Sequence, residues 1–405
     1  TSIFDGSAWE YDERSGEYYL HLFDKKQPDL NYHNPEVIRE VKEIMRFWLD
    51  RGVAGFRCDV IDAIYKTSLA DGEKRDFAQG IEHYKAQEGN HRILKELRKE
   101  VLDHYDCFTV GEAMKVTLEE GRLLSEPDRH ELDMVIYFDH LEADAGETRF
   151  DFVPFRADCL LGVFAKWQQG LSWNALYLEN HDQPRIVSHY GDDRRYRERS
   201  AKLLATMLMT LRGTPYVYQG QEIGMTNFDL KRLADLKDVE SFNIDRLMRS
   251  RGIPAFLRWR WIRQASRDNA RTPVQWTAGP QAGFTTGTPW LPVNGNHATI
   301  NYAAQRGDEH SVLGYYKCMI ALRAGSETLK YGDFTPLFAN RRVMAYARTL
   351  NGERYTVLLN LSRHAARAEV AGEVVASNME LKTYAGRLAP FEAVVLCTRA
   401  GEAKP

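Results

Sequence analysis

Hydrophobic positions along the chain follow two alternating patterns, short apolar runs and longer segments with the helical period. The short runs have a strand-like composition and cover residues 53–59, 107–112, 134–138, 175–178 and 215–218. Segments with apolar residues on one helical face separate them, around residues 93–102, 160–164, 203–211 and 312–322. Short apolar strands that alternate with helices are typical of a parallel sheet covered by helices. The pattern therefore predicts an α/β fold of about five strand–helix units.

The clearest helix signal follows Asn34. Asn34 can cap a helix, Pro35 suits its first turn, and Gly52 is placed to end it. The apolar residues that recur on one face of this helix are Val37, Ile38, Val41, Ile44, Met45, Trp48 and Leu49. Local sequence alone thus predicts a helix before the first strand.

The chain divides into three parts by composition: residues 1–31, 32–329 and 330–405. The first part is polar and aromatic, and we interpret it as the end of a long loop excursion. The second part is the α/β part, which a charged excursion at 220–271 and a Gly/Pro/Trp-rich loop at 273–294 interrupt. Loops this long are usually functional. The third part has short β-type runs between turn residues, which predict an antiparallel β-sandwich domain.

Bulk composition narrows the possible partners. The chain has 405 residues, of which 43% are hydrophobic and 27% are charged, so it is long enough for a packed core. With a formal net charge of −3 the chain has no excess of positive charge to bind phosphate groups, which argues against a nucleic-acid partner. No apolar run approaches the roughly 20 residues of a membrane helix, so no membrane partner is expected.

The five cysteines show neither metal-type spacing nor close pairs. We therefore expect reduced, mostly buried thiols in a cytoplasmic protein. The sequence indicates neither a metal site nor a cofactor.

Three acidic residues stand where apolar runs give way to loops: Asp59, Glu112 and Asp182. Side chains alternate along a strand, so Arg57 and Asp59 should face the same way. A neighbouring guanidinium keeps a carboxylate ionised, as a nucleophile requires. Glu112 follows apolar residues, which favour the protonated form that a general acid needs. Retaining glycosidases pair these two roles across about 5–5.5 Å, and Asp182, preceded by His181, would be a third group that binds sugar hydroxyls.

Each of these residues also has a plainer explanation. A single acidic residue at a strand end is more often a helix cap or part of a structural ion pair. Arg57 and Asp59 alone would fit a buried structural pair, and His181 would fit a hydrogen-bonded core histidine. The combination of the three acidic strand ends favours the catalytic interpretation.

Several motifs resemble those of one enzyme family. GFRCD at 55–59, VGE at 110–112 and NHD at 180–182 are similar to the second, third and fourth sequence regions of the α-amylase superfamily, glycoside hydrolase family thirteen. Other segments resemble its oligo-1,6-glucosidase and α-glucosidase subfamily. They are QPDLN at 27–31, YQG at 218–220, EIGM at 222–225 and RDNARTPVQW at 267–276.

The resemblance implies a role for each matching residue. Asp59 would be the nucleophile, Glu112 the acid and then the base, and Asp182 the stabiliser of the transition state. Arg57 and His181 would hydrogen-bond the nucleophile and the sugar hydroxyls, and Arg271 would face the non-reducing-end glucose. Val60 resembles members that prefer α-1,6 bonds, because a β-branched side chain narrows the leaving-group site. An ordinary packing valine is the alternative explanation for that residue.

The sequence departs from the family pattern in two places. An earlier family region, with an Asp and a His on the third barrel strand, has no counterpart, so we expect a partial TIM-type (β/α)₈ barrel with strands four to eight only. The missing N-terminal barrel segment would then be needed for a complete site, and the chain alone would be inactive or poorly stable. The other departure is His189, where many relatives have Arg.

The resemblance implies a retaining exo-α-glucosidase that acts on small, isomaltose-like oligosaccharides. A sucrose isomerase or another transglucosylase is the alternative within the family, because a sugar can intercept the glucosyl ester in place of water. An alternative from another class is a non-catalytic relative, like the heavy chains of amino-acid transporters. Such relatives lose the carboxylates, whereas all three are present here.

Overall fold

The computed structural model describes residues 2–3, 6–75, 78–146 and 153–400. The chain forms two compact units. The first comprises Thr1–Phe138 and Gly170–Ala175, and the second comprises Asp139–Gln169 and Leu176–Pro405. The predicted three-part division into 1–31, 32–329 and 330–405 stays a prediction.

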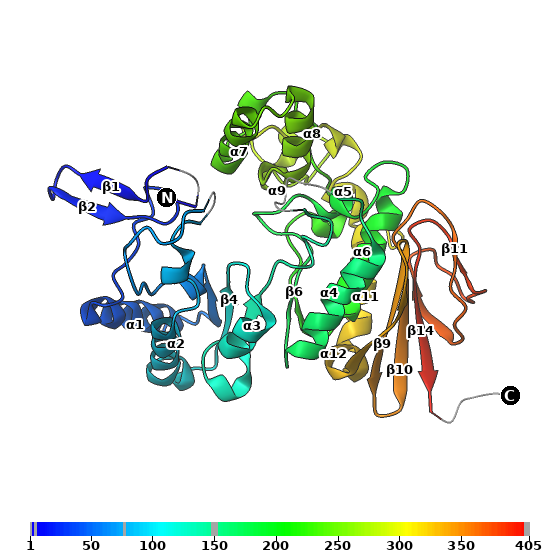
Figure 1. The fold of residues 1–405 in the computed structure, drawn as a ribbon. Coiled ribbons are helices and arrows are strands. Elements are labelled where there is room, and N and C mark those ends of the chain that lie inside the picture. Colours follow the sequence, from blue (N-terminus) through cyan, green and yellow to red (C-terminus); the bar gives the residue numbers. More distant parts are fainter. Residues whose placement is uncertain (1, 4–5, 76–77, 147–152, 401–405) are drawn as a thin grey trace. The chain divides into compact units, whose positions relative to one another are not determined.

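The first unit is built around a small parallel sheet in the order β3-β4-β5 (Figure 1). Its strands are β3 (Gly55–Cys58), β4 (Phe108–Glu112) and β5 (Met134–Ile136). The unit also contains the helices α1 (Pro35–Leu49), α2 (Glu88–Glu100) and α3 (Leu118–Ser125). An antiparallel hairpin is formed by strands β1 (Trp9–Asp12) and β2 (Glu17–Leu20). The predicted alternation of short parallel strands with helices is confirmed in this unit.

Helix α1 begins where its local signals predict. The Asn34 side chain accepts a hydrogen bond from the backbone N–H of Glu36, and Pro35 occupies the first turn. The helix ends at Leu49, and the N–H of Gly52 donates to the Leu49 carbonyl. Its apolar stripe is only partly covered, because Leu49 is buried whereas Trp48 is exposed.

The second unit contains helix α4 (Ala157–Gly170) up to Gln169, and the helices α5 (Ile186–His189) and α6 (Arg197–Thr210). Strands β6 (Ala175–Leu176) and β7 (Thr214–Pro215) pair in a two-stranded sheet. The strands predicted at 175–178 and 215–218 are therefore shorter than expected. After β7 the chain turns at Gly220, whose φ of +86° is rarely open to other residues. The later helices are α7 (Val239–Ser250), α8 (Ala255–Ala265), α9 (Asp268–Arg271), α10 (Tyr302–Gln305), α11 (Val312–Ala324) and α12 (Glu327–Tyr331).

The C-terminal part of this unit is an antiparallel sheet in the order β12-β14-β10-β9-β8. Its strands are β8 (Asp333–Ala339), β9 (Val343–Leu350), β10 (Glu353–Asn360), β12 (Glu373–Ser377) and β14 (Ala393–Arg399). A small second sheet pairs β11 (Ala366–Arg367) with β13 (Arg387–Leu388), and Ala368 and Leu388 join the core of the larger sheet. The predicted C-terminal antiparallel domain is confirmed, whereas the partial barrel stays a prediction.

Two buried arginines bind carbonyls near the C-terminus of α6, one from this sheet and one from a helix that lies beside the sheet in Figure 1. Arg348 on β9 donates to the carbonyls of Thr210, Leu329 and Gly332. Arg323 on α11 also donates to the Leu329 carbonyl, and to those of Met209, Leu211 and Gly213. Burial lowers the pKa of Arg323 to about 10 and that of Arg348 to about 9. The carbonyls at the C-terminus of α6 carry partial negative charge, which offsets the cost of burying these cations.

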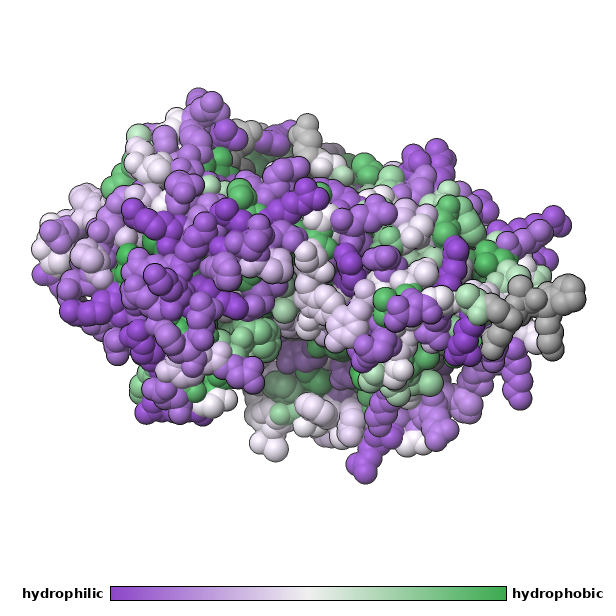
Figure 2. All heavy atoms as spheres, turned by 90° about the horizontal axis from the view of Figure 1, so that it is seen from below, coloured by the Kyte–Doolittle hydropathy of each residue, from purple (hydrophilic) through white to green (hydrophobic). Residues whose placement is uncertain are grey.

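The surface seen in Figure 2 is mainly hydrophilic, with hydrophobic residues in separate groups. Among the described residues, no helix is both long and apolar enough to span a bilayer. All five cysteines are free, as expected. The expectation that most are buried is wrong, since only Cys397 is buried and Cys159 and Cys318 are exposed. A cytoplasmic location stays a prediction.

Candidate active site

The parallel register of the first unit brings Asp59 and Glu112 to the same edge of the sheet. Cys58, the last residue of β3, lies opposite Gly111 of β4, so the two acidic residues follow at the same level. Close strand contact requires Gly55, because a Cβ at that position would collide with the backbone of Phe108. Asp59 directly follows its strand and Glu112 ends the next one, as the sequence predicts.

The guanidinium of Arg57 binds both carboxylates. Its Nη1 donates to Asp59 Oδ1 at 2.6 Å, and its Nη2 donates to Glu112 Oε2. Both carboxylates therefore lie within hydrogen-bond reach of one planar group. The Asp59 side chain is 63% exposed and that of Glu112 is 15% exposed. The more exposed carboxylate is accessible to a ligand, and the other is nearly covered.

The expectation that Glu112 stands among apolar neighbours is wrong in one respect. Val110 beside it is buried, but Arg57 reaches its carboxylate from the adjacent strand. Sequence order does not show this neighbour, because Arg57 lies 55 residues away along the chain.

Val60, directly after Asp59, adopts a left-handed backbone conformation with φ 41° and ψ 44°. A β-branched residue rarely adopts this conformation, and strain of this kind is frequent at functional sites. The side chain packs beside a cluster formed by Leu22, Ala63 and Tyr84. The turn after Asp59 is therefore held by its surroundings and not by local preference.

Asp62 is a residue of this turn that sequence reasoning missed. Its carboxylate is buried and accepts the backbone N–H of Met114 at 3.1 and 3.2 Å. Burial raises the pKa of Asp62 to about 6, and the hydrogen bond from Met114 opposes this rise. Met114 lies two residues after Glu112, so Asp62 connects the loops that follow the two strands.

The second unit holds Asp182 in a cluster of cationic side chains. Arg271 Nη2 donates to Asp182 Oδ1 at 2.6 Å, and Arg267 Nη1 donates to the same oxygen at 3.2 Å. His181 Nε2 lies 3.2 Å from Asp182 Oδ2, and Arg271 Nε donates to the His181 carbonyl at 2.8 Å. Burial alone would raise the pKa of Asp182, but the hydrogen bond from His181 and the charges of His181, Arg267 and Arg271 hold it well below its usual range.

The loop that carries Asp182 is closed by a buried ion pair that sequence reasoning missed. Arg185 Nη1 donates to Glu179 Oε1 at 2.9 Å, and both side chains are almost fully buried. Glu179 Oε2 also accepts the N–H of Ile186 at 2.6 Å. The sequence did contain a signal for this pair, because Glu179 and Arg185 carry opposite charges and flank the segment NHDQP at 180–184. His189, one turn further on, binds Asp144 at 2.9 Å.

The predicted site residues thus fall into two groups. The structure brings Arg57, Asp59 and Glu112 together in the first unit, with Val60 beside them. It brings His181, Asp182 and Arg271 together in the second unit. That the two groups meet around one substrate stays a prediction. In the described part of the chain, no cluster of three or more His, Cys, Asp or Glu residues is suited to a metal ion.

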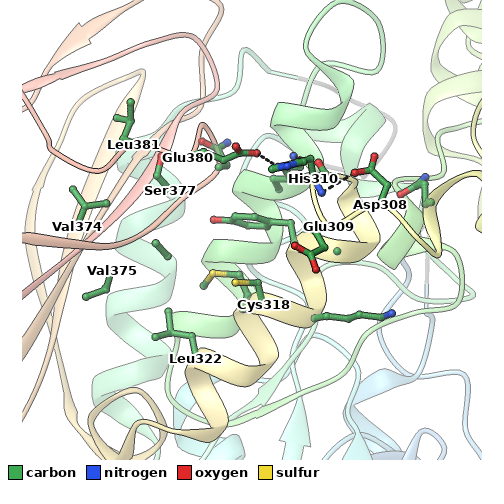
Figure 3. Close-up of a pocket in the computed structure, with 18 of the residues that line it drawn as sticks. Asp308, Glu309, His310, Cys318, Leu322, Val374, Val375, Ser377, Glu380 and Leu381 are labelled. Carbon is green, nitrogen blue, oxygen red and sulfur yellow. Dashed lines mark hydrogen bonds and ion pairs between the residues drawn. The ribbon is translucent and has the colours of Figure 1, made fainter.

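A separate pocket of about 750 Å³ lies in the second unit between α11 and β12 (Figure 3). His310 Nδ1 and Glu380 Oε1 pair at 2.5 Å at its rim, and Cys318 and Leu322 line it. None of the predicted site residues lines this pocket. It is therefore not part of the site that the sequence indicates.

Comparison with known proteins identifies the family. Residues 1–332 match the family model described as alpha amylase, catalytic domain. Because this match begins at residue 1, it gives no support to the expected absence of an N-terminal barrel segment.

Individual relatives agree with this match. The oligo-1,6-glucosidase of Parageobacillus thermoglucosidasius is 46% identical over 391 residues, which are 94% of this chain and 69% of the relative. A variant of the isomaltulose synthase of Erwinia rhapontici NX5, solved with sucrose, superposes with a TM-score of 0.92 at 37% identity, covering 98% of this chain and 74% of the other. The trehalose-6-phosphate hydrolase of Bacillus licheniformis gives a TM-score of 0.89 at 37% identity, covering 98% and 75%. The chain belongs to the α-amylase family of glycoside hydrolases.

Proposed function

We propose that the protein is a retaining exo-α-glucosidase that prefers α-1,6 bonds in small oligosaccharides. The observation that carries this proposal is the single guanidinium of Arg57 bonded to both Asp59 and Glu112. It supports a separation of the two carboxylates short enough for direct attack on the sugar, as in retaining enzymes. The similarity to an oligo-1,6-glucosidase supports the choice of substrate.

The proposed reaction has two displacement steps. The Asp59 carboxylate attacks the anomeric carbon while Glu112 gives its proton to the departing glycosidic oxygen, which leaves a glucosyl ester on Asp59. Water then attacks the same carbon, Glu112 takes a proton from that water, and the ester bond to Asp59 breaks. Asp182, kept ionised by the cations around it, would bind sugar hydroxyls and favour the distorted ring.

Product analysis tests the proposal. The protein is incubated with isomaltose, maltose and sucrose in turn, and proton NMR follows the first product. We expect α-glucose as the first product from isomaltose and slower cleavage of maltose. First-formed β-glucose would exclude retention.

A sucrose isomerase is the second candidate, and the similarity to an isomaltulose synthase favours it. In that reaction fructose intercepts the glucosyl ester in place of water. Rearranged disaccharide formed from sucrose in excess of free glucose would establish this candidate over the hydrolase.

Val60 gives a prediction on linkage preference. Replacing Val60 by alanine removes the β-branch that its left-handed backbone holds beside the Leu22, Ala63 and Tyr84 cluster. We expect the ratio of kcat/KM for isomaltose to that for maltose to fall about 10-fold, since small changes in an apolar pocket have effects of this size. Kinetics with both disaccharides measure it.

Val53→Ala is the matched control, because Val53 is an exposed valine of the same unit. This variant should leave the ratio unchanged. A ratio that Val60→Ala also leaves unchanged would assign Val60 to packing only.

A further inference from the structure

We propose that Arg267, held by Asp238, is a positioning residue that fixes the carboxylate of Asp182. The proposal rests on the proposed function, in which Asp182 acts on the sugar. It concerns two residues outside the predicted site, and all the contacts that support it lie within the second unit.

Arg267 and Arg271 bind the same oxygen of Asp182 but differ in their other contacts. Arg271 makes its further hydrogen bond to the carbonyl of His181. Arg267 makes two contacts with Asp238 Oδ1, at 2.9 Å from Nε and 2.6 Å from Nη2, and its Nε lies 3.2 Å from Glu240 Oε2. Arg267 is therefore restrained by carboxylates on two sides, with the N–H at Nη1 directed to Asp182.

Asp238 is a rigid anchor for this guanidinium. Its side chain is fully buried and caps helix α7, accepting the N–H of Ser241 at 3.2 Å and the Ser241 hydroxyl at 2.8 Å. The Ser241 hydroxyl oxygen also lies 3.0 Å from Ser266 Oγ, next to Arg267, and can accept the Ser266 hydroxyl proton. Asp268 accepts the N–H of Asp238 at 3.0 Å. The two ends of the α7–α8 excursion are thus locked together at the position of Arg267.

This arrangement gives the excursion a role in the site. A buried carboxylate with a cation partner keeps that cation in one place, and the cation then limits the orientation of the Asp182 carboxylate. Among the described residues, the titratable side chains that contact Asp182 include His181, Arg267 and Arg271, with Asp238 and Glu240 behind Arg267. Arg267 contributes to holding the pKa of Asp182 low, after His181.

Replacing Arg267 by glutamine tests the contact directly. The change removes the N–H that reaches Asp182 and leaves Arg271 and His181 in place. We expect kcat on p-nitrophenyl α-glucoside to fall about 10- to 100-fold, because misplacement of a reacting group by about 1 Å has this effect. KM should change by less than about three-fold, since the loss falls on the transition state. Arg267→Lys should recover only part of the loss, because one ammonium cannot replace the planar fork.

Asp238→Asn tests the anchor. We expect a smaller fall in kcat than for Arg267→Gln, because Glu240 still contacts the guanidinium. Adding Asp238→Asn to Arg267→Gln should lower kcat little further, since both changes act through the same contact. Arg263→Gln is the matched control, because Arg263 on α8 pairs with the exposed Asp229 at 2.9 Å. This control should keep kcat within about two-fold of the wild type.

Crystal structures of the wild type and Arg267→Gln provide a measurement that needs no turnover. The proposal expects the Asp182 carboxylate to rotate or become disordered in the variant. An unmoved carboxylate, or a loss of kcat fully explained by a smaller folded fraction, would overturn it. These structures decide the role of Arg267 whether or not the wild type cleaves an α-glucoside, so a failure of this proposal and a failure of the proposed function can be distinguished.

Discussion

Asp59→Ala should reduce kcat for every α-glucoside by about 10⁵-fold, the size of effect seen when a catalytic nucleophile is removed. The other carboxylate that contacts Arg57 is that of Glu112, which is the proposed acid and does not replace Asp59 as the nucleophile. The strained turn at Val60 lies next to the change, so circular dichroism should accompany the kinetics to establish that the variant is folded. Steady-state rates with p-nitrophenyl α-glucoside measure the loss.

Added azide distinguishes a lost nucleophile from a damaged site. The Asp59→Ala variant has room for a small anion on the face that the carboxylate occupied. Azide should restore part of the activity and give β-glucosyl azide, because a single attack from that face inverts the anomeric carbon. Asp128→Ala, at an exposed aspartate of the same unit, should behave as the wild type. Full activity of Asp59→Ala without azide would remove Asp59 from the mechanism.

The features that the sequence predicted well depend on near neighbours in the chain. Asn34 and Pro35 start helix α1 where the capping signals placed it. The alternation of side chains along a strand predicted that Arg57 and Asp59 face the same way. In the structure, Arg57 Nη1 lies 2.6 Å from Asp59 Oδ1. These features follow from local hydrogen bonding and from the geometry of a single strand.

The features that the sequence did not predict join distant segments. Arg57 contacts Glu112 across 55 residues, and Arg267 contacts Asp182 across 85 residues. A single sequence does not show the register of neighbouring strands, and it does not show which carboxylate each arginine contacts. The short pairing of β6 with β7 belongs to the same class, because its length depends on the neighbouring strand and not on the apolar run.

Glu112→Gln should separate substrates by their leaving groups. Glutamine keeps the size of the side chain and can still accept a hydrogen bond from Arg57, but it has no proton to transfer. We expect isomaltose turnover to fall about 10²- to 10⁴-fold, the usual contribution of general acid catalysis. The rate of glucosyl-ester formation from 2,4-dinitrophenyl α-glucoside should fall far less, since dinitrophenolate leaves without a proton. Pre-steady-state measurement of dinitrophenolate release isolates this step.

The pH dependence provides a second, independent measurement of the same change. In the wild type the first step needs a proton on Glu112, so kcat/KM for isomaltose should have an alkaline limb on which this proton is lost. The alkaline limb should therefore disappear in Glu112→Gln. Glu119→Gln, at an exposed glutamate of α3 in the same unit, should leave both the rates and the limb unchanged. Equal losses on the two substrates with the alkaline limb intact would show that Glu112 only positions Arg57, because a group that transfers no proton cannot distinguish a sugar alcohol from a phenolate.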